Sequence, residues 1–338
     1  MMVKTMKKAG VAAFAVALSL SCTVLTGCAK DEAREKVTRV RLSEVTHSVF
    51  YAPQYAAMEL GYFEEEGIRL EVISGEGADK VMTSVISRAV DVGFSGPEAA
   101  IYIYNEGKED FANLFAQVTQ RDGAFLAARE PMPDFKWTDL KDSHLLPGRK
   151  GGAPYMALEW VVKGAGLVPG VDVEFDNSIQ YAAMTGAFMS GTGDFVTIFE
   201  PTASTIEAEG KGFIVASVGE SAGEIPYTAY YALKSYIAKN PDVIQGFTNA
   251  VARGQKWVKE HTPQEIADVI APQFPDADIE ILAKAIGRYK EIDAYATNPA
   301  LSEEAFNRLQ TVMTQAGELA DTVPYSELVD NSFAERAK

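Results

Sequence analysis

The stretch from Gly75 to Glu98 constrains the fold most, because it predicts a complete loop, helix, strand, turn and second helix. Val81, Val85 and Ala89 recur at four-residue steps, which indicates the apolar stripe of a helix. A short strand is predicted over residues 91–94. One complete helix–strand–helix unit of this kind is typical of α/β proteins.

The predicted strand is followed by a turn that suits ligand binding. Gly96 is expected at the N-cap of the second helix, and Pro97 at its first position. The first backbone N–H groups of a helix have no partner within the helix. Open α/β sheets bind small ligands at the carboxyl ends of their strands. The turn therefore predicts part of a ligand site.

The N-terminus has the pattern of a secretory signal. Three lysines precede an apolar run over residues 9–20, and small residues lead to Cys28. The run is too short for a membrane span, so we predict a signal peptide over residues 1–27. Residues 25–28 resemble a bacterial lipobox, which implies cleavage before Cys28 and a lipid on its thiol. The alternative is an ordinary cleaved signal with an incidental cysteine.

Charge and cysteine content exclude several classes. Cys22 and Cys28 are the only cysteines, so the chain beyond them has no disulfide, cysteine-ligated metal or cysteine nucleophile. Loss of residues 1–27 removes three lysines and no acids, which takes the formal charge from −16 to −19. Such a chain repels nucleic acid and anionic lipid. Residues 28–36 are expected to form a charged tether that begins with the lipidated cysteine.

Further along the chain, strand-like and helical patterns alternate. Strands are predicted over residues 37–45, 68–73, 111–118 and 124–129, and a helix is expected to start near Pro53. Alternation of Val171, Val173 and Phe175 with acidic residues predicts a half-buried strand, followed by a helix over 180–189 and strands over 213–218 and 225–233. Thr262 to Glu265 has the pattern of a capping box.

Three segments carry a family resemblance: Ala52 to Ile68, Gly77 to Lys80 and Asp91 to Phe94. They resemble solute-binding proteins for nitrate, sulfonates, taurine and thiamine-pyrimidine precursors, which feed ABC importers. The resemblance implies a periplasmic-binding-protein-like α/β fold of type II, with two lobes, each a mixed sheet flanked by helices, and a ligand cleft between them. Residues 37–128 and 227–338 would form lobe 1, and residues 129–226 lobe 2. Residues 142–148 depart from the clean apolar strand that this family usually has there.

The second lobe repeats the ligand-turn pattern. Residues 193–201 combine an acid, an apolar strand and Glu200 beside Pro201, as residues 91–98 do with Glu98. Arg149 and Lys150 lie in another glycine-rich turn before a helix, which suits either a tight turn or an anion site.

Nine residues of the strand-to-helix turns are the candidate ligand contacts. The aromatic ones offer flat surfaces for a ring, and the two glutamates are either carboxylates for a cationic or N–H-rich partner or helix-start acids. Together they favour a planar nitrogen-rich ring such as a thiamine-precursor aminopyrimidine. The basic turn favours the alternative, a sulfonate, taurine or nitrate. The nine candidates are His47, Phe50, Tyr51, Ser95, Glu98, Arg149, Tyr155, Glu200 and Tyr227.

An enzymatic function is less well supported by the sequence than solute binding. Residues 219–223 have the spacing of a nucleophile elbow, but we expect a glycine-rich loop without the helix that such an elbow requires. The resemblance also reaches fungal thiamine-pyrimidine synthases, which carry a cysteine-rich iron-binding stretch that this chain lacks. The three histidines have no metal-ligand spacing. We therefore expect no enzyme, metal or cofactor, but a monomer that is lipid-anchored outside the cell membrane and meets a solute and an ABC permease. A structural or adhesive lipoprotein would not need ligand turns in both lobes.

Overall fold

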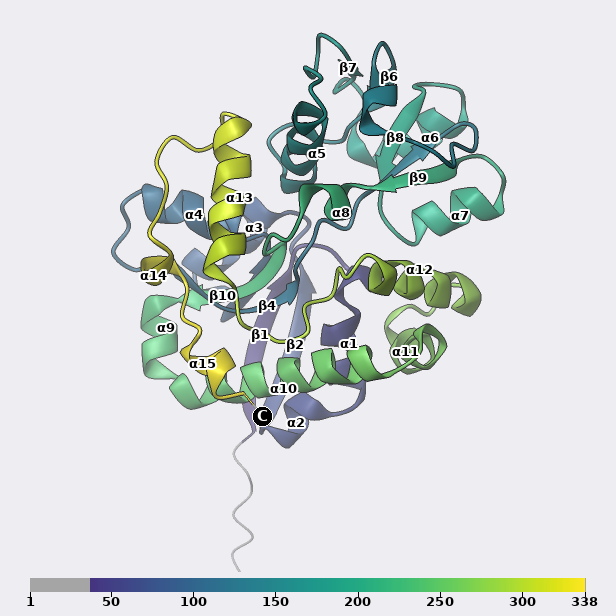
Figure 1. Cartoon of the computed structure of the whole chain (residues 1–338). Helices are drawn as coiled ribbons and strands as arrows, with labels where there is room; N and C mark the ends of the chain where they lie inside the picture. The colour runs from purple at the N-terminus through teal and green to yellow at the C-terminus, as the bar shows by residue number, and fades with distance from the viewer. Residues whose placement is uncertain (1–36, 338) are drawn as a thin grey trace, which may run out of the picture. The chain divides into compact units, whose positions relative to one another are not determined.

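The computed structural model describes residues 37–337 (Figure 1). The signal peptide, Cys28 and the charged tether lie outside the described residues, so these expectations stay predictions. None of the helices between residues 37 and 337 is long and apolar enough to span a membrane.

The first sheet is mixed and has five strands. β1 runs parallel to β2 and β3, whereas β10 runs antiparallel to β3 and β4. The late strand β10 therefore returns the chain to the sheet that its first strands built, as the sequence predicted. The strand order is β2 (Ile68–Ser74), β1 (Thr38–Glu44), β3 (Val92–Ser95), β10 (Thr228–Leu233) and β4 (Ala112–Thr119).

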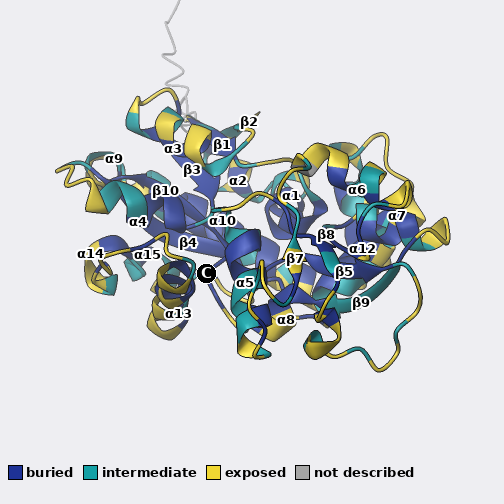
Figure 2. Ribbon diagram, turned by 90° about the horizontal axis from the view of Figure 1, so that it is seen from above, coloured by how far each residue is buried: buried dark blue, intermediate teal, exposed yellow. Residues whose placement is uncertain are grey.

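The second sheet is also mixed and has five strands. β6 runs parallel to β7 and β8, and β5 runs antiparallel to β8 and β9. Figure 2 shows the central strands of both sheets in the buried colour. The predicted two-sheet α/β architecture is confirmed. The strand order is β7 (Glu174–Phe175), β6 (His144–Leu146), β8 (Phe195–Ile198), β5 (Phe125–Ala128) and β9 (Phe213–Ser217).

Helices connect the strands and cover the sheets. The predicted capping box at Thr262 is present, since Thr262 and Glu265 each bond to the other's backbone N–H. The elements are η1 (Val49–Tyr51), α1 (Ala52–Glu59), α2 (Tyr62–Glu65), α3 (Ala78–Ile86), α4 (Glu98–Asn105), η2 (Trp137–Leu140), α5 (Ala153–Gly164), α6 (Tyr181–Met189), α7 (Thr202–Ala208), α8 (Val218–Ala222), α9 (Lys234–Lys239), α10 (Pro241–Glu260), α11 (Pro263–Ile270), η3 (Ala271–Gln273), α12 (Ile279–Glu291), α13 (Glu303–Gln315), α14 (Tyr325–Leu328) and α15 (Ser332–Glu335).

Three local predictions were wrong. Only Glu174–Phe175 of the predicted half-buried strand is a strand, because the Gly170 N–H donates to the Val173 carbonyl in a turn that leaves Val171 80% exposed. Helix α4 begins at Glu98, so the N-cap is Pro97 rather than Gly96. Residues 219–223 do not form a glycine-rich loop, since most of them belong to α8.

The chain crosses between the two sheets at residues 120–124 and 218–227. Backbone hydrogen bonds join the two crossing segments: Ile225 donates to Gln120, and Val218 donates to Ala124, both at 3.0 Å. Because β5 pairs within the second sheet, the first crossing comes before Phe125. Our proposed lobe boundary therefore moves from residue 128 to residues 120–124.

Candidate ligand site

A cavity of about 220 Å³ lies at the carboxyl end of β8, between the starts of α6 and α7. Its walls combine three threonine hydroxyls with apolar side chains, so it can hold a small solute and hydrogen-bond its polar groups. The sequence had singled out none of these residues as ligand contacts. The lining residues are Ala182, Met184, Thr185, Thr197, Ile198, Phe199 and Thr202.

Aromatic residues from the first sheet approach this cavity. Phe50 of η1, directly after β1, has its ring centroid 6.4 Å from that of Phe199 and 5.7 Å from that of Tyr227. Tyr51 packs edge-on against Phe94 at 4.7 Å. Three predicted aromatics, Phe50, Tyr51 and Tyr227, thus lie in one group, each no more than 9% exposed.

The crossing segments lie close to this aromatic group. A β-carbon at Gly123 would lie 2.8 Å from the ring of Phe50, and one at Gly219 would collide with the carbonyl of Asp122. Only glycine lets the backbone approach this closely. These glycines place the crossing segments directly beside Phe50.

Glu98 is a buried carboxylate with incomplete hydrogen bonding. Its Oε2 has no hydrogen-bond partner among the described residues. Burial raises the pKa of Glu98 to about 7, although its own backbone N–H and the positive charge of Arg149 act to lower it. Since Glu98 starts α4 and Arg149 follows β6, the two sheets bring opposite charges near each other. A β-carbon on Gly148, next to Arg149, would lie 4.0 Å from the Thr197 hydroxyl in the cavity wall.

Asp122 is a second buried carboxylate, in the first crossing segment. One of its oxygens accepts the N–H of Ala124 at 2.6 Å. Burial raises the pKa of Asp122 to about 7, against the lowering effect of hydrogen bonds from Ala124 and Tyr227. The sequence did not indicate Asp122, because nothing in its local pattern predicts burial.

The carboxylate of Glu200 forms hydrogen bonds to other residues of the protein. Its Oε1 accepts from Arg288 Nη1 at 2.5 Å and from the Ser204 hydroxyl at 3.0 Å, while Oε2 accepts the Ser204 N–H at 2.9 Å. The carboxylate therefore caps the start of α7, which agrees with the alternative of a helix-start acid.

The other three candidates are also engaged by neighbours. The Ser95 and Tyr231 hydroxyls lie 2.6 Å apart in the first sheet. Tyr155 of α5 packs edge-on against Phe175 at 5.7 Å. His47 Nδ1 lies 2.8 Å from Glu44 Oε1, and this hydrogen bond is the main cause of a raised His47 pKa. The structure places none of these three in the cavity wall.

Ser221 lies on α8 and accepts a hydrogen bond from the indole N–H of Trp137 at 2.8 Å. The helix contains the serine instead of starting after it, so the geometry of a nucleophile elbow is not reproduced. Across residues 37–337, no group of three or more His, Cys, Asp or Glu side chains is placed to hold a metal ion.

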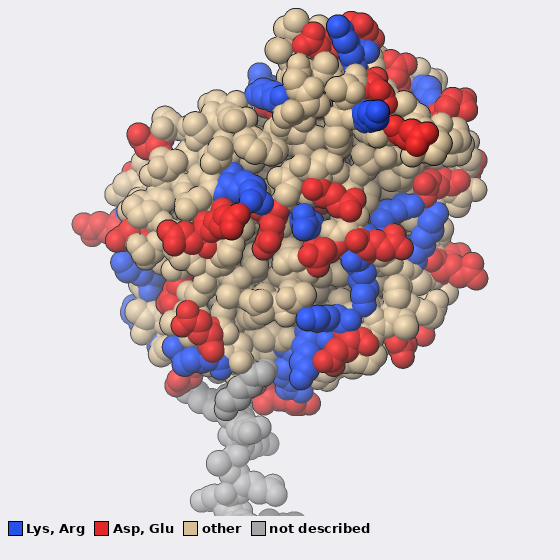
Figure 3. All heavy atoms as spheres, in the orientation of Figure 1, with Lys and Arg blue, Asp and Glu red and all other residues tan. Residues whose placement is uncertain are grey.

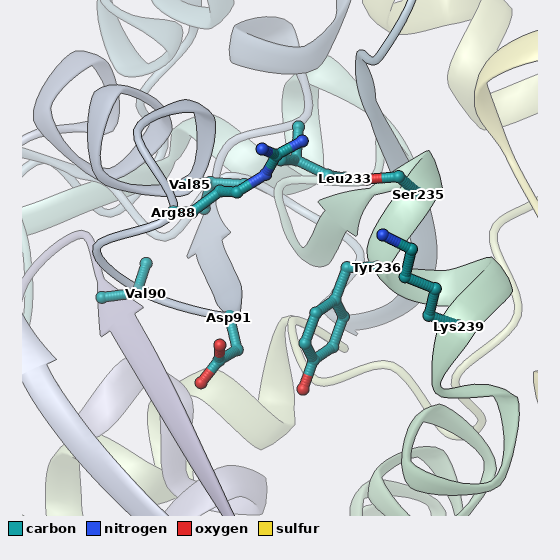
Figure 4. Close-up of a pocket in the computed structure, with 8 residues that line it drawn as sticks. All are labelled: Val85, Arg88, Val90, Asp91, Leu233, Ser235, Tyr236 and Lys239. Atoms are coloured by element: carbon teal, nitrogen blue, oxygen red, sulfur yellow. The ribbon is translucent and has the colours of Figure 1, made fainter.

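A second cavity of about 180 Å³ lies at the amino end of β3, the opposite edge of the first sheet from the β3–α4 turn (Figure 4). Two of its three charged lining residues form local ion pairs, Arg88 with Asp110 at 3.0 Å and Asp91 with Arg41 at 2.8 Å; Lys239 is the third. Figure 3 shows acidic and basic side chains similarly interspersed on the visible face. This cavity is therefore a weaker candidate for a ligand site.

Comparisons with known proteins agree with this fold. A ligand-binding component of an ABC-type import system from Staphylococcus aureus has a TM-score of 0.70 at 16% identity, covering 89% of this chain and 99% of that one. The alkanesulfonate-binding protein SsuA from Xanthomonas axonopodis pv. citri, bound to MOPS, has a TM-score of 0.68 at 14% identity, covering 87% and 98%. These likenesses show the periplasmic-binding-protein-like fold.

Sequence comparison assigns the family. YtlA from Bacillus subtilis (strain 168), provisionally named a binding protein, is 42% identical over 312 residues, covering 92% of each chain. Residues 49–266 match the family described as NMT1/THI5 like. This chain therefore belongs to the NMT1/THI5-like family.

Proposed function

We propose that this chain is the extracytoplasmic solute-binding protein of an ABC importer and delivers a small organic solute to its permease. The observation that carries the proposal is the cavity at the carboxyl end of β8, walled by Phe199 next to Phe50 of the first sheet. Ligand sites of open α/β sheets lie at such strand ends. The import-system component and the sulfonate-binding protein that share the fold support this reading.

A planar nitrogen-containing ring, such as a thiamine-precursor pyrimidine, is the solute class we favour. Phe50 packs on Phe199 of the cavity wall, and Tyr51 and Tyr227 pack on Phe50. We now favour Glu98 over Glu200 as the carboxylate that binds an amino group of the solute. Glu98 Oε2 has no hydrogen-bond partner among the described residues, whereas Glu200 is paired with Arg288. An unpartnered buried acceptor costs about 1–3 kcal/mol, so an N–H donor on the solute would remove that cost.

A sulfonate, taurine or nitrate is the second candidate. Three threonine hydroxyls line the cavity, and α6 starts there with neither a capping side chain nor an acid in its first turn. A helix start of this kind favours an anion, and Arg149 lies in the neighbouring loop. The sulfonate-binding protein bound to MOPS supports this alternative.

Titration calorimetry separates the two classes. The solutes are a thiamine-precursor aminopyrimidine, riboflavin, taurine, an alkanesulfonate and nitrate. If the ring class is right, Glu98→Gln weakens aminopyrimidine binding at least tenfold and Arg149→Ala has a smaller effect. Tight taurine or alkanesulfonate binding that Arg149→Ala abolishes and Glu98→Gln leaves unchanged would contradict the ring class. Binding of none of the five would contradict the proposed solute classes.

Solute capture would close the two lobes by a hinge at the crossing segments. A solute that touches both lobes stabilises the closed state by its differential affinity for it. Small-angle scattering should show a smaller radius of gyration at saturating solute. An unchanged profile would count against closure.

The lipid-anchored localisation of the protein is also a proposal. Cys28→Ala should leave the precursor without lipid and abolish partitioning into the detergent phase. Partitioning that the substitution leaves intact would contradict lipid anchoring. Sedimentation of the detergent-solubilised protein should show the expected monomer.

A further inference from the structure

Arg288, on α12, is at the centre of a cluster of ion pairs. Its Nη1 donates to Glu200 Oε1 and its Nη2 to Glu207 Oε2, both at 2.5 Å, and Lys284 Nζ lies 3.1 Å from the same Glu207 oxygen. The Glu200 side chain is fully buried, and those of Arg288 and Glu207 are 17% and 23% exposed. Arginine presents its N–H donors as a planar fork, so one side chain can bind two carboxylates at once.

This cluster joins elements that belong to the two sheets. Glu200 and Glu207 follow β8 of the second sheet, on the β8–α7 turn and on α7. The helix that carries Arg288 packs on α7 and also on η1, which follows β1 of the first sheet, and the ring centroid of Tyr289 lies 4.7 Å from that of Phe50. Figure 1 shows α12 next to α11.

Tyr289 makes a second link between the same elements. Its hydroxyl accepts the backbone N–H of Glu200 at 3.1 Å, directly before the cis Glu200–Pro201 peptide bond. Phe199 and Thr202, which flank this bond, both line the cavity. Arg288 and Tyr289 therefore hold both the side chain and the backbone of the cavity's β8–α7 turn.

The charges of the cluster depend on one another. Burial acts to lower the pKa of Arg288, but Glu200 and Glu207 outweigh it and raise that pKa. Burial likewise acts to raise the pKa of Glu207, and the hydrogen bonds from Arg288 and Lys284 lower it overall. Removing the guanidinium would leave Glu200 as a buried carboxylate without its cation, which is strongly unfavourable.

We propose that Arg288 is a positioning residue that sets solute affinity from outside the cavity, by tying the β8–α7 turn to the first sheet. The inference rests on the proposed solute-binding function. A solute binds more weakly when only a fraction of the protein has the competent arrangement. Loss of Arg288 lowers that fraction and leaves the cavity-lining residues unchanged.

The first test measures the separation of the two sheets and needs no solute. Spin labels are attached to cysteines at exposed Lys80 on α3 and Lys211 after α7, in the full chain with Cys22 and Cys28 replaced by serine. Arg288→Met should shift the label distances to longer values. Lys284→Met is the matched control, because Lys284 lies on the same helix and reaches only Glu207; it should leave the distances unchanged. Arg288→Lys should restore part of the short-distance population.

Hydrogen exchange gives a local readout that shows whether Arg288→Met remains folded. The amides of Glu200 and Ser204 should lose protection in Arg288→Met, while those of β10 keep theirs. A variant that loses protection throughout is unfolded, and the comparison then moves to Arg288→Lys and to the double variant Glu200→Gln with Arg288→Met, which removes the buried charge together with its cation. Unchanged label distances in every folded Arg288 variant would overturn the proposal.

The second test measures binding of the aminopyrimidine, and of taurine if the pyrimidine does not bind. Arg288→Met should raise the Kd at least tenfold, mainly through faster dissociation, whereas Lys284→Met should stay within about twofold. An unchanged Kd in Arg288→Met would overturn the positioning role. Failure of every solute to bind the wild type would instead contradict the proposed solute classes, and the label distances would still decide whether Arg288 ties the sheets together.

Discussion

The ring centroid of Phe50, in η1 after the first strand, lies 6.4 Å from that of Phe199, which follows β8 of the second sheet. Phe50 was expected at a ligand site from its place in a strand-to-helix turn. Phe199 lies within the strand-to-helix unit predicted for the second lobe, but the sequence predicted its neighbour Glu200 as the ligand contact. The contact shows that the two predicted turns meet, with Phe199 in the cavity wall and Phe50 packed beside it.

Glu98→Gln should change how stability depends on pH. The Glu98 pKa is raised from 4.5 to about 7 in the folded protein, so between these values the folded state binds more protons than the unfolded state. The contribution of Glu98 to wild-type stability therefore falls as pH rises from 4.5 to 7, and it stays lower above that window. The substitution removes this loss, so the variant should gain about 1–3 kcal/mol relative to wild type across the window.

Urea unfolding at pH 4.5, 6 and 8 measures this difference. Asp122 also has a raised pKa, of about 7, and stays in both proteins, so its contribution cancels. A stability difference that is constant from pH 4.5 to 8 would show that Glu98 ionises normally.

Glu200→Gln should destabilise the fold rather than act mainly on the solute. The amide keeps the shape of the side chain but leaves Arg288 with Glu207 as its one remaining carboxylate partner, at a cost of about 1–3 kcal/mol. Glu209→Gln is the matched control, because Glu209 is exposed and its pair with Lys211 is expected to be worth less than about 1 kcal/mol. Normal stability of Glu200→Gln with lost solute binding would return Glu200 to the solute site.

Gly123→Ala should lower the free energy of unfolding by about 1–3 kcal/mol, because its β-carbon would lie 2.8 Å from the ring of Phe50. Gly186→Ala is the opposite case, since Gly186 is exposed inside α6 with nothing within 4 Å of an added β-carbon. It should stabilise by about 0.5–1 kcal/mol. Thermal unfolding of both variants checks the pair, and equal effects would contradict the close approach at Gly123.

Ser221→Ala should leave solute affinity within a few-fold, and a fluorophosphonate probe should not label the wild type. Ser221 accepts the Trp137 N–H at 2.8 Å, so the substitution should cost no more than about 1 kcal/mol of stability. Mass spectrometry after probe treatment is the measurement. Stoichiometric labelling at Ser221 would identify a nucleophile and contradict a pure binding role.

The sequence by itself determined the βα units and the family. The capping box at Thr262 and the apolar run of β10 depend on contacts close along the chain, and these predictions were confirmed. The predicted stripe of α3 was confirmed for Val81 and Val85, whereas Ala89 lies beyond the end of the helix and is exposed. The alternation around Val171 predicted a longer strand than the structure contains, because residues 168–173 form a turn with its own hydrogen bonds. The starts of α1, α4, α6 and α11 were predicted to within a residue, whereas α8 was not predicted as a helix.

Only the tertiary structure decided what each buried charge does. Glu98 and Glu200 have similar settings in the sequence, yet Glu200 meets Arg288, 88 residues further along the chain, and Glu98 Oε2 meets no described partner. The cavity threonines have no sequence signal because a threonine is ordinary in any helix or strand, and these three lie in α6, in β8 and at the start of α7. The physical reason is that a carboxylate's role depends on the charges and hydrogen-bond donors that folding brings within a few ångströms, and sequence spacing does not encode those distances.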